Sequence, residues 1–221
     1  ISSDANGAVT KYGASLGGDH SKETLPPSEN DYSVGLLIHY GAFSYVTTAD
    51  NDGVYLNGAS YTYNDIEAVI GPRIGGEVDV FEADHHGSTY SNNAVYLGIM
   101  KPQVSVVSCG EDNTYGHPAQ TTLDRLLGYG DVFLTEKGVS EVNYKTAVLS
   151  YSDIVITVPE GDGSTFTVTA KNGTYSKTYT SKGITTCKDW CHVTSMAIPV
   201  IPFSLLLLLV FPGFLFLLTS K

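Results

Sequence analysis

Two adjacent histidines, His85 and His86, stand in the run Ala-Asp-His-His-Gly-Ser-Thr at 83–89, just after the short apolar stretch 78–81. The glycine in this run lets the backbone turn tightly. Imidazole nitrogens are common ligands for zinc and other divalent metals. We interpret the run as a candidate metal-binding turn at the end of a buried strand. A surface turn with both rings in water is the alternative interpretation.

Two more polar turns follow strand-like segments. Asp50 lies in the acidic turn 49–53, and His117 lies in the turn Asn-Thr-Tyr-Gly-His-Pro at 113–118. Loops at the C-terminal ends of strands converge in layered α/β folds, so we expect the three turns to share one site. A carboxylate and imidazoles form a partial ligand set for a divalent metal. Such a metal with an open position lowers the pKa of bound water to about 7, which makes hydroxide available for hydrolysis.

The segments around these turns alternate between strand and helix patterns. Two strand-like runs at 33–40 and 43–48 are predicted to form a hairpin across Gly41-Ala42. Asn93 is predicted to cap a short helix that ends at Met100. A capping box, Thr121 to Asp124, predicts a helix that stops at Gly128. With further strands at 78–81, 104–107 and 132–135, the central region is predicted to be α/β.

The pattern changes after Lys145. Short β-branched runs at 147–150, 154–158 and 165–169 have no helical pattern between them. Asn172-Gly173, between two alternating runs, indicates a two-residue hairpin. We therefore expect a small all-β appendage over 146–183. At the other end, residues 1–32 are polar and are interpreted as a loop, a remnant of an upstream region.

The charge balance narrows the classes of partner. The 221 residues hold 12 Lys and Arg against 23 Asp and Glu, a net charge of −11. This disfavours a nucleic-acid-binding surface, which needs clustered cations, and electrostatic attachment to anionic lipid. An acid-rich, lysine-poor composition fits an extracellular or membrane-associated protein. Cys109, Cys187 and Cys191 supply no paired motif for a structural zinc site.

The segment 197–218 is almost wholly apolar. Its length suits a membrane span, which needs about 20 apolar residues, although three prolines would kink such a helix. A transmembrane segment, a lipid-anchor signal and a misread reading frame all stay open as interpretations. A membrane is therefore one expected partner of this segment.

Together, the segments 33–50, 78–88 and 108–118 resemble the metallo-β-lactamase superfamily. They are most similar to its ComEC-like branch, which is related to the hydrolase domain of competence DNA-uptake proteins. That branch shows a T-G-D turn, an H-H-G-S turn and an N-x-Y-G-H-P turn in this order. Here Ala49 stands where the first turn has glycine. The resemblance covers about 30–140 and implies that 33–145 is the C-terminal half of an αββα four-layer sandwich.

The resemblance also implies roles for single residues. Asp50 would be a catalytic carboxylate that bridges two metal ions, and His85 would bind the second metal. His86 is the alternative ligand if the turn is shifted by one residue. His117 would line the site as a catalytic proton donor, a contact to substrate phosphate or an accessory ligand. Two Zn²⁺ ions, or another divalent metal, and a phosphodiester or other small-molecule substrate are the implied cofactor and partner.

One departure from the family pattern is large. The H-x-H-x-D-H stretch, which supplies most ligands of the first metal in the superfamily, occurs nowhere in the 221 residues, and the chain begins at Ile1. We expect a C-terminal part of the domain with an incomplete metal site, inactive alone, whose full-length parent is a zinc-dependent hydrolase. A catalytically inactive relic of the fold and a membrane-anchored surface binding protein are the alternatives.

Overall fold

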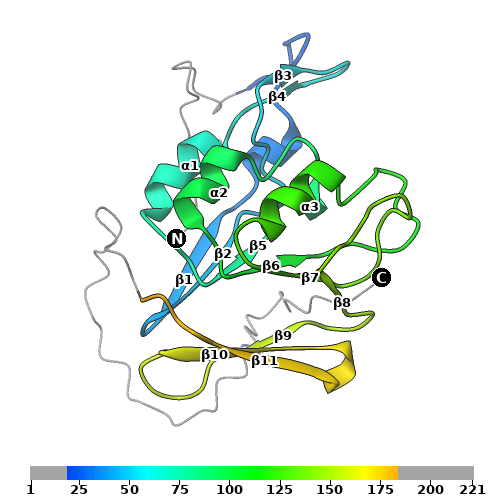
Figure 1. Cartoon of the computed structure of the whole chain (residues 1–221). Helices are drawn as coiled ribbons and strands as arrows, with labels where there is room; N and C mark the ends of the chain where they lie inside the picture. Colours follow the sequence, from blue (N-terminus) through cyan, green and yellow to red (C-terminus); the bar gives the residue numbers. More distant parts are fainter. Residues whose placement is uncertain (1–18, 184–221) are drawn as a thin grey trace, which may run out of the picture.

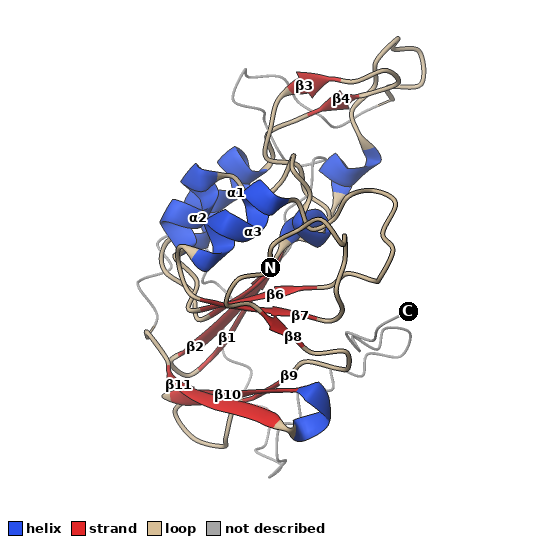
Figure 2. Ribbon diagram, turned by 45° about the vertical axis from the view of Figure 1, so that its right-hand side comes forward, coloured by secondary structure: helices blue, strands red, loops and turns tan. Residues whose placement is uncertain are grey.

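The computed structural model describes residues 19–183, which form three layers. A six-stranded sheet lies in the middle, three helices cover one of its faces, and a three-stranded sheet covers the other (Figures 1 and 2). The architecture is therefore mixed α/β, as the alternation of patterns predicted. A second helical layer, which a four-layer sandwich requires, is not present among residues 19–183.

The central sheet has the strand order β1-β2-β5-β6-β7-β8. β1 and β2 pair antiparallel as a hairpin, and every other neighbouring pair is parallel. Five strands therefore end at the same edge of the sheet, which we call the C-terminal edge. The strands are β1 (Leu36–Tyr40), β2 (Phe43–Thr47), β5 (Val80–Glu82), β6 (Val104–Val107), β7 (Asp131–Leu134) and β8 (Val148–Leu149).

The helical layer consists of α1 (Glu67–Ile74), α2 (Ala94–Met100) and α3 (Gln120–Leu127). The helices pack on the sheet through one apolar core, in which Leu97 of α2 and Leu123 of α3 are completely buried. The side chain of Asn93 accepts a hydrogen bond from the Tyr96 amide at 2.9 Å and so caps α2.

The second sheet has the order β11-β10-β9 and consists of β9 (Val155–Thr157), β10 (Thr165–Ala170) and β11 (Tyr175–Thr180). Its inner face and the outer face of the central sheet form a second core. Phe43 of β2 meets Phe166 of β10 there, with ring centroids 5.1 Å apart. Both faces of the central sheet are thus covered, which explains why its inner strands are almost continuously apolar.

Smaller elements complete the described chain. A hairpin of β3 (Leu56–Asn57) and β4 (Thr62–Tyr63) projects beyond the helical layer (Figure 1). Three short 3₁₀ turns lie at Glu29–Tyr32, Asp84–Gly87 and Lys171–Gly173.

Several local predictions are confirmed. The β1–β2 hairpin, the strand at 104–107 and the helix capped by Asn93 all form as expected. The capping box at Thr121 is wrong, because α3 begins at Gln120 and its N-cap, Ala119, makes no side-chain hydrogen bond. The end of this helix at Gly128 is as predicted.

The C-terminal β segments differ from expectation in two respects. The strand near 147–150 pairs in parallel with β7, so it extends the central sheet, and the small sheet begins only at Val155. The hairpin between β10 and β11 forms, but its connection is a 3₁₀ turn and not a two-residue turn. Lys171, Asn172 and Gly173 all have positive φ in that turn.

Residues 1–18 and 184–221 lie outside the described part of the chain, and the apolar segment 197–218 falls in the second range. Over residues 19–183, none of the helices has the length and apolar character that crossing a membrane requires.

One buried carboxylate fastens the layers at the edge opposite the C-terminal edge. Asp79, which is completely buried, accepts hydrogen bonds from the Ser44 amide (2.8 Å), the Gln103 side chain (2.8 Å) and the Lys182 amide (2.7 Å). These donors belong to β2, to the start of β6 and to the segment after β11. Asp79 therefore joins the small sheet to the central sheet.

We predict that Asp79→Ala lowers the free energy of unfolding by about 3 kcal/mol, because buried donors lose their charged acceptor. Chemical denaturation of the purified chain measures this loss. Asp153→Ala, which removes an exposed acid, is the control and should change stability by less than about 0.5 kcal/mol. A loss below about 1 kcal/mol for Asp79→Ala would contradict the role of this carboxylate.

Candidate functional site

The acidic turn follows β2 at the C-terminal edge. Ala49 turns the chain with a φ of 53°, and the Asn51 side chain donates to the Thr48 carbonyl at 2.8 Å. Asp50 stays at the rim, where 44% of its side chain is exposed. Asp52 is completely buried, and neither of its carboxylate oxygens has a hydrogen-bond partner.

The histidine turn, Asp84–Gly87, follows β5 at the same edge. His85 and His86 have φ values of 50° and 55°, a left-handed conformation that is rare and strained for residues other than glycine. The His85 amide donates to the Ala49 carbonyl at 2.9 Å, which ties this turn to the acidic turn. Gly87 has a φ of 77°, and a Cβ atom there would lie 2.8 Å from Cβ of Pro118. Glycine is therefore required at this position.

A hydrogen bond fixes the orientation of the His86 ring. Its Nδ1 lies 2.8 Å from the Ser108 carbonyl oxygen. Because a carbonyl oxygen only accepts, Nδ1 must carry the proton. In the neutral ring, Nε2 is then the free lone-pair atom, and it lies 3.8 Å from Oδ1 of Asp50.

His117 completes the cluster from the turn after β6. Its ring centroid lies 5.2 Å from that of His85 and 6.4 Å from that of His86. The ring of Tyr115, 83% exposed, stacks on the outer side of His117. The structure therefore brings all four predicted site residues together: Asp50, His85, His86 and His117.

Asp52 is the residue of this cluster that sequence reasoning missed. Its Oδ1 lies 3.5 Å from Nδ1 of His85. The same Nδ1 lies 3.3 Å from Nδ2 of the Asn30 side chain. The acidic turn was recognised from the sequence, but only its first acid was assigned to the site. No local signal separates the two acids, because the burial of Asp52 depends on tertiary contacts of the turn, such as the bond from the Glu67 amide to the Asp52 carbonyl at 3.2 Å.

Burial and neighbouring charges separate the pKa values of these groups. Burial raises the pKa of Asp52, although His85 opposes this shift. Burial lowers the pKa of His85, but Asp52 and Asp50 outweigh it and the net shift is upward. Burial, together with the charges of His85 and His86, lowers the pKa of His117 to about 4. His117 is therefore a neutral imidazole at physiological pH.

The donor groups are of the types that bind a divalent metal, but too few of them lie together to complete a site. Imidazole nitrogens and carboxylates are ligands that zinc accepts, and a buried carboxylate without partners is unfavourable unless a cation or proton compensates it. Four of the five groups form two carboxylate–imidazole pairs, Asp52 with His85 and Asp50 with His86, and His117 is the fifth. Between residues 19 and 183, no group of three or more His, Cys, Asp or Glu side chains is arranged to hold a metal ion. The cluster is thus a partial ligand set.

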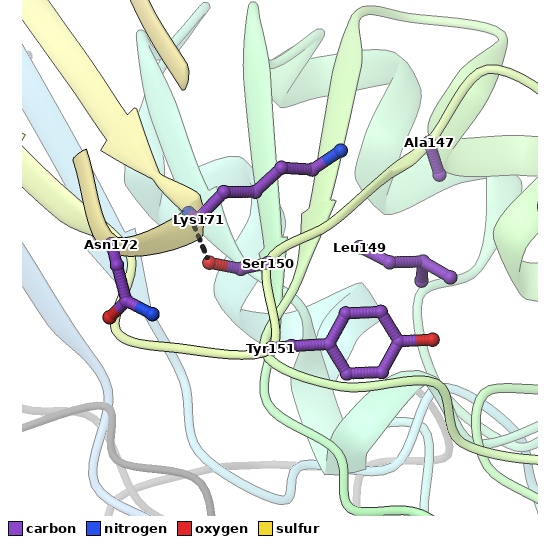
Figure 3. A pocket seen from close by; sticks show the side chains of 6 residues that line it. All are labelled: Ala147, Leu149, Ser150, Tyr151, Lys171 and Asn172. Carbon is purple, nitrogen blue, oxygen red and sulfur yellow. Dashed lines mark hydrogen bonds between the residues drawn. The ribbon is translucent and has the colours of Figure 1, made fainter. Parts of the chain in front are cut away.

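An open hollow of about 480 Å³ lies elsewhere at the C-terminal edge, beyond the end of β8 (Figure 3). The Lys171 amide donates to the Ser150 hydroxyl at 2.9 Å and joins the two loops that form it. β8 is three strands away from β5, a separation of about 14 Å, and the hollow shares no residue with the cluster. Its lining residues are Ala147, Leu149, Ser150, Tyr151, Lys171 and Asn172.

Comparison with known proteins finds homologues among competence proteins. The chain is 27% identical to ComE operon protein 3 of Bacillus subtilis over 129 residues and 33% identical to competence protein ComA of Neisseria gonorrhoeae over 116 residues. It is 26% identical to recombination protein 2 of Haemophilus influenzae over 102 residues. No protein-family model matches the chain.

These similarities cover parts of each protein. The matched segments make up 58%, 49% and 46% of this chain, but only 15%, 15% and 11% of the respective relatives. The chain thus spans between about one ninth and one seventh of the length of these relatives.

We predict that the histidines of the metal-free chain titrate in the order that their surroundings impose. His85 should become protonated above its ordinary pKa of about 6.5, and His117 only near pH 4. Between these values, His85 is charged and His117 is neutral. A pH titration of the ring resonances by ¹H–¹⁵N NMR measures the order, and protonation of His117 before His85 would contradict the geometry.

We further predict that Asp52→Asn stabilises the metal-free chain. Because burial raises the pKa of Asp52 in the folded state, its contribution to stability is present at low pH and is lost as pH rises through that pKa. The gain in free energy of unfolding should therefore be about 1 kcal/mol at pH 8 and near zero at pH 4. Denaturation at both pH values measures it.

The matched control is Asp50→Asn in the same turn, whose exposed carboxylate should leave stability nearly unchanged. An Asp52→Asn variant that is less stable than wild type at pH 8 would show that this carboxylate is compensated in the folded chain.

Proposed function

We propose that residues 33–145 are part of a metallo-β-lactamase-like domain that hydrolyses phosphodiesters with the help of divalent metal ions. The observation that carries the proposal is Asp52, a buried carboxylate without a hydrogen-bond partner that faces His85. Carboxylates are rarely buried without a compensating charge, and His85 compensates Asp52 only while its ring is protonated. A metal ion between the acidic and histidine turns would compensate Asp52 when the ring is neutral.

The two acids and two of the histidines would be divided between two metal-binding positions. Asp52 and His85 would contribute to one metal position, and Asp50 and His86 to the other. When bound, Zn²⁺ or a similar ion would supply an activated water molecule and neutralise charge on a phosphate group. The ligands that complete both positions would come from outside residues 19–183.

His117 is suited to binding a metal ion or to contacting a phosphate group. With a pKa of about 4, its imidazole is neutral at physiological pH and keeps a lone pair, and its ring centroid lies 5.2 Å from that of His85 and 6.4 Å from that of His86. The strained histidine turn places the ring of His85 against Asp52 and the ring of His86 against Asp50. The Ser108 carbonyl binds Nδ1 of His86, so Nε2 keeps its lone pair. The turn therefore orders the imidazoles of His85 and His86 without help from a ligand.

The phosphodiester class is supported by the similarity to competence proteins, and we propose a role in DNA uptake at the cell envelope. The net charge of −11 gives the chain as a whole no attraction for a polyanion. Divalent ions at the cluster would reverse the local charge, so the overall charge does not oppose the proposal.

A catalytically inactive relic of the fold is the second candidate. It is favoured by two observations: the H-x-H-x-D-H stretch is absent from the sequence, and the five donors form no closed set among residues 19–183. A membrane-anchored binding protein would depend on 197–218, which lies outside the described residues.

The test measures metal binding and hydrolysis on the 221-residue chain. We predict that it binds Zn²⁺ or Mn²⁺ by titration calorimetry and that Asp52→Asn and His85→Ala each weaken binding at least tenfold, because each removes a ligand. His39→Gln is the control, since this histidine pairs with Ser44 toward the opposite edge of the sheet. It should bind metal like the wild type.

Hydrolysis of bis(p-nitrophenyl) phosphate with either metal provides the second readout. Because the 221 residues lack the H-x-H-x-D-H stretch, we expect little or no turnover from this chain, and any turnover by the wild type that disappears in His85→Ala supports the hydrolase. Equal metal affinity in the wild type, Asp52→Asn and His85→Ala would contradict the proposal and favour the catalytically inactive relic of the fold.

A further inference from the structure

The histidine turn needs support from outside itself. Two consecutive non-glycine residues in the left-handed region cost on the order of 1–3 kcal/mol each, and such strain persists only where neighbouring structure holds the backbone. His85 and His86 are two such residues.

The side chain of Asn92 binds the first residue of the histidine turn, Asp84. Its Oδ1 accepts a hydrogen bond from the Asp84 amide, and its Nδ2 donates to the Asp84 carbonyl oxygen, both at 2.9 Å. One carboxamide thus satisfies both backbone groups of Asp84, as a neighbouring strand would do. Asn92 is completely buried, so water cannot replace these bonds.

Asn92 is itself held firmly by two helices. The Glu67 carboxylate, at the start of α1, accepts from the amides of Asn92 and Asn93. The Arg125 guanidinium of α3 donates to the Asn92 carbonyl oxygen at 2.9 Å. Figure 1 shows α1, α2 and α3 side by side on the same face of the sheet. The grip on Asp84 is therefore anchored in the helical layer.

The residues on either side of Asn92 bind the acidic turn. The Tyr90 carbonyl accepts from the Gly53 amide at 2.8 Å, and the Ser91 hydroxyl donates to the Asn51 carbonyl at 2.8 Å. The Asn93 side chain donates to the Gly53 carbonyl at 3.1 Å. The segment 90–93 consequently bridges the two turns, and Asn92 supplies its side-chain contact to the histidine turn.

We propose that Asn92 is a positioning residue for this site: its carboxamide holds the backbone of Asp84 so that His85 and His86 are ordered against the acidic turn before any ligand binds. Only one consequence of this role, a higher metal affinity, rests on the proposed function. The ordering of the two rings is a property of the metal-free chain.

The test compares Asn92→Ala and Asn92→Gly with Ser44→Ala in the 221-residue chain. Ser44→Ala removes a buried hydroxyl that bonds to Asp79 near the opposite edge, so it controls for loss of stability alone. Asn92→Gly removes the carboxamide but accepts the φ of 61° without strain, which keeps a foldable variant available.

We expect both Asn92 variants to shift and broaden the His85 and His86 ring resonances in ¹H–¹⁵N NMR spectra of the metal-free chain. We also expect Zn²⁺ affinity to fall about tenfold, the size typical of losing a group that orients a ligand. Ser44→Ala should lower the melting temperature but leave the histidine spectra and Zn²⁺ affinity unchanged.

Wild-type histidine resonances in both Asn92 variants would overturn the positioning role. A wild-type chain that binds no Zn²⁺ would contradict the proposed function instead, because the histidine spectra of the metal-free chain decide the role of Asn92 without any metal.

Discussion

The parallel pairing of β2 with β5 is the constraint on which the candidate site depends. Their register aligns Thr47 with Glu82, so both strands end at the same level. The acidic turn and the histidine turn therefore begin side by side, and the backbone bond from His85 to Ala49 closes the gap between them. A shift of one residue in this register would also turn the buried side chains of β5 to the wrong face.

Beneath the two turns, a polar network takes the place of apolar packing. The Thr48 hydroxyl donates to Asp84 at 2.5 Å and also contacts the Tyr96 hydroxyl at 2.9 Å. Burial, and then the charge of Glu67, raise the pKa of Asp84 well above its ordinary value, and burial raises that of Glu67 to about 8. Such a network is unfavourable unless its members are hydrogen-bonded, and this requirement makes its geometry specific.

Most elements of the central region, apart from β3, β4 and α1, could be predicted from the sequence, because alternation, the Asn93 cap and the hairpin across Gly41-Ala42 are local signals. The proximity of Asp50, His85, His86 and His117 could also be predicted from the sequence, because parallel strands end at the same edge of a sheet. Asp52 could not be chosen over Asp50, because burial depends on contacts with Glu67 and the 90–93 segment.

Other features also depend on tertiary context. The helix α1 carries Pro72 and was not predicted, and its Glu67 matters only through the loop that it holds. The placement of β8 in the central sheet likewise depends on pairing with β7, for which a two-residue strand gives no sequence signal. Asn92 looks like an ordinary loop asparagine until its partner Asp84 is known.

The attachment of Lys182 to Asp79 has a consequence for how the domain is presented. It holds the last described residues at the edge of the sheet where the parallel strands begin, and the two turns lie where those strands end. A tether joined after Gly183 would therefore leave the molecule from the far side. A tag or spacer fused at Gly183 would thus leave the acidic and histidine turns open to approaching molecules.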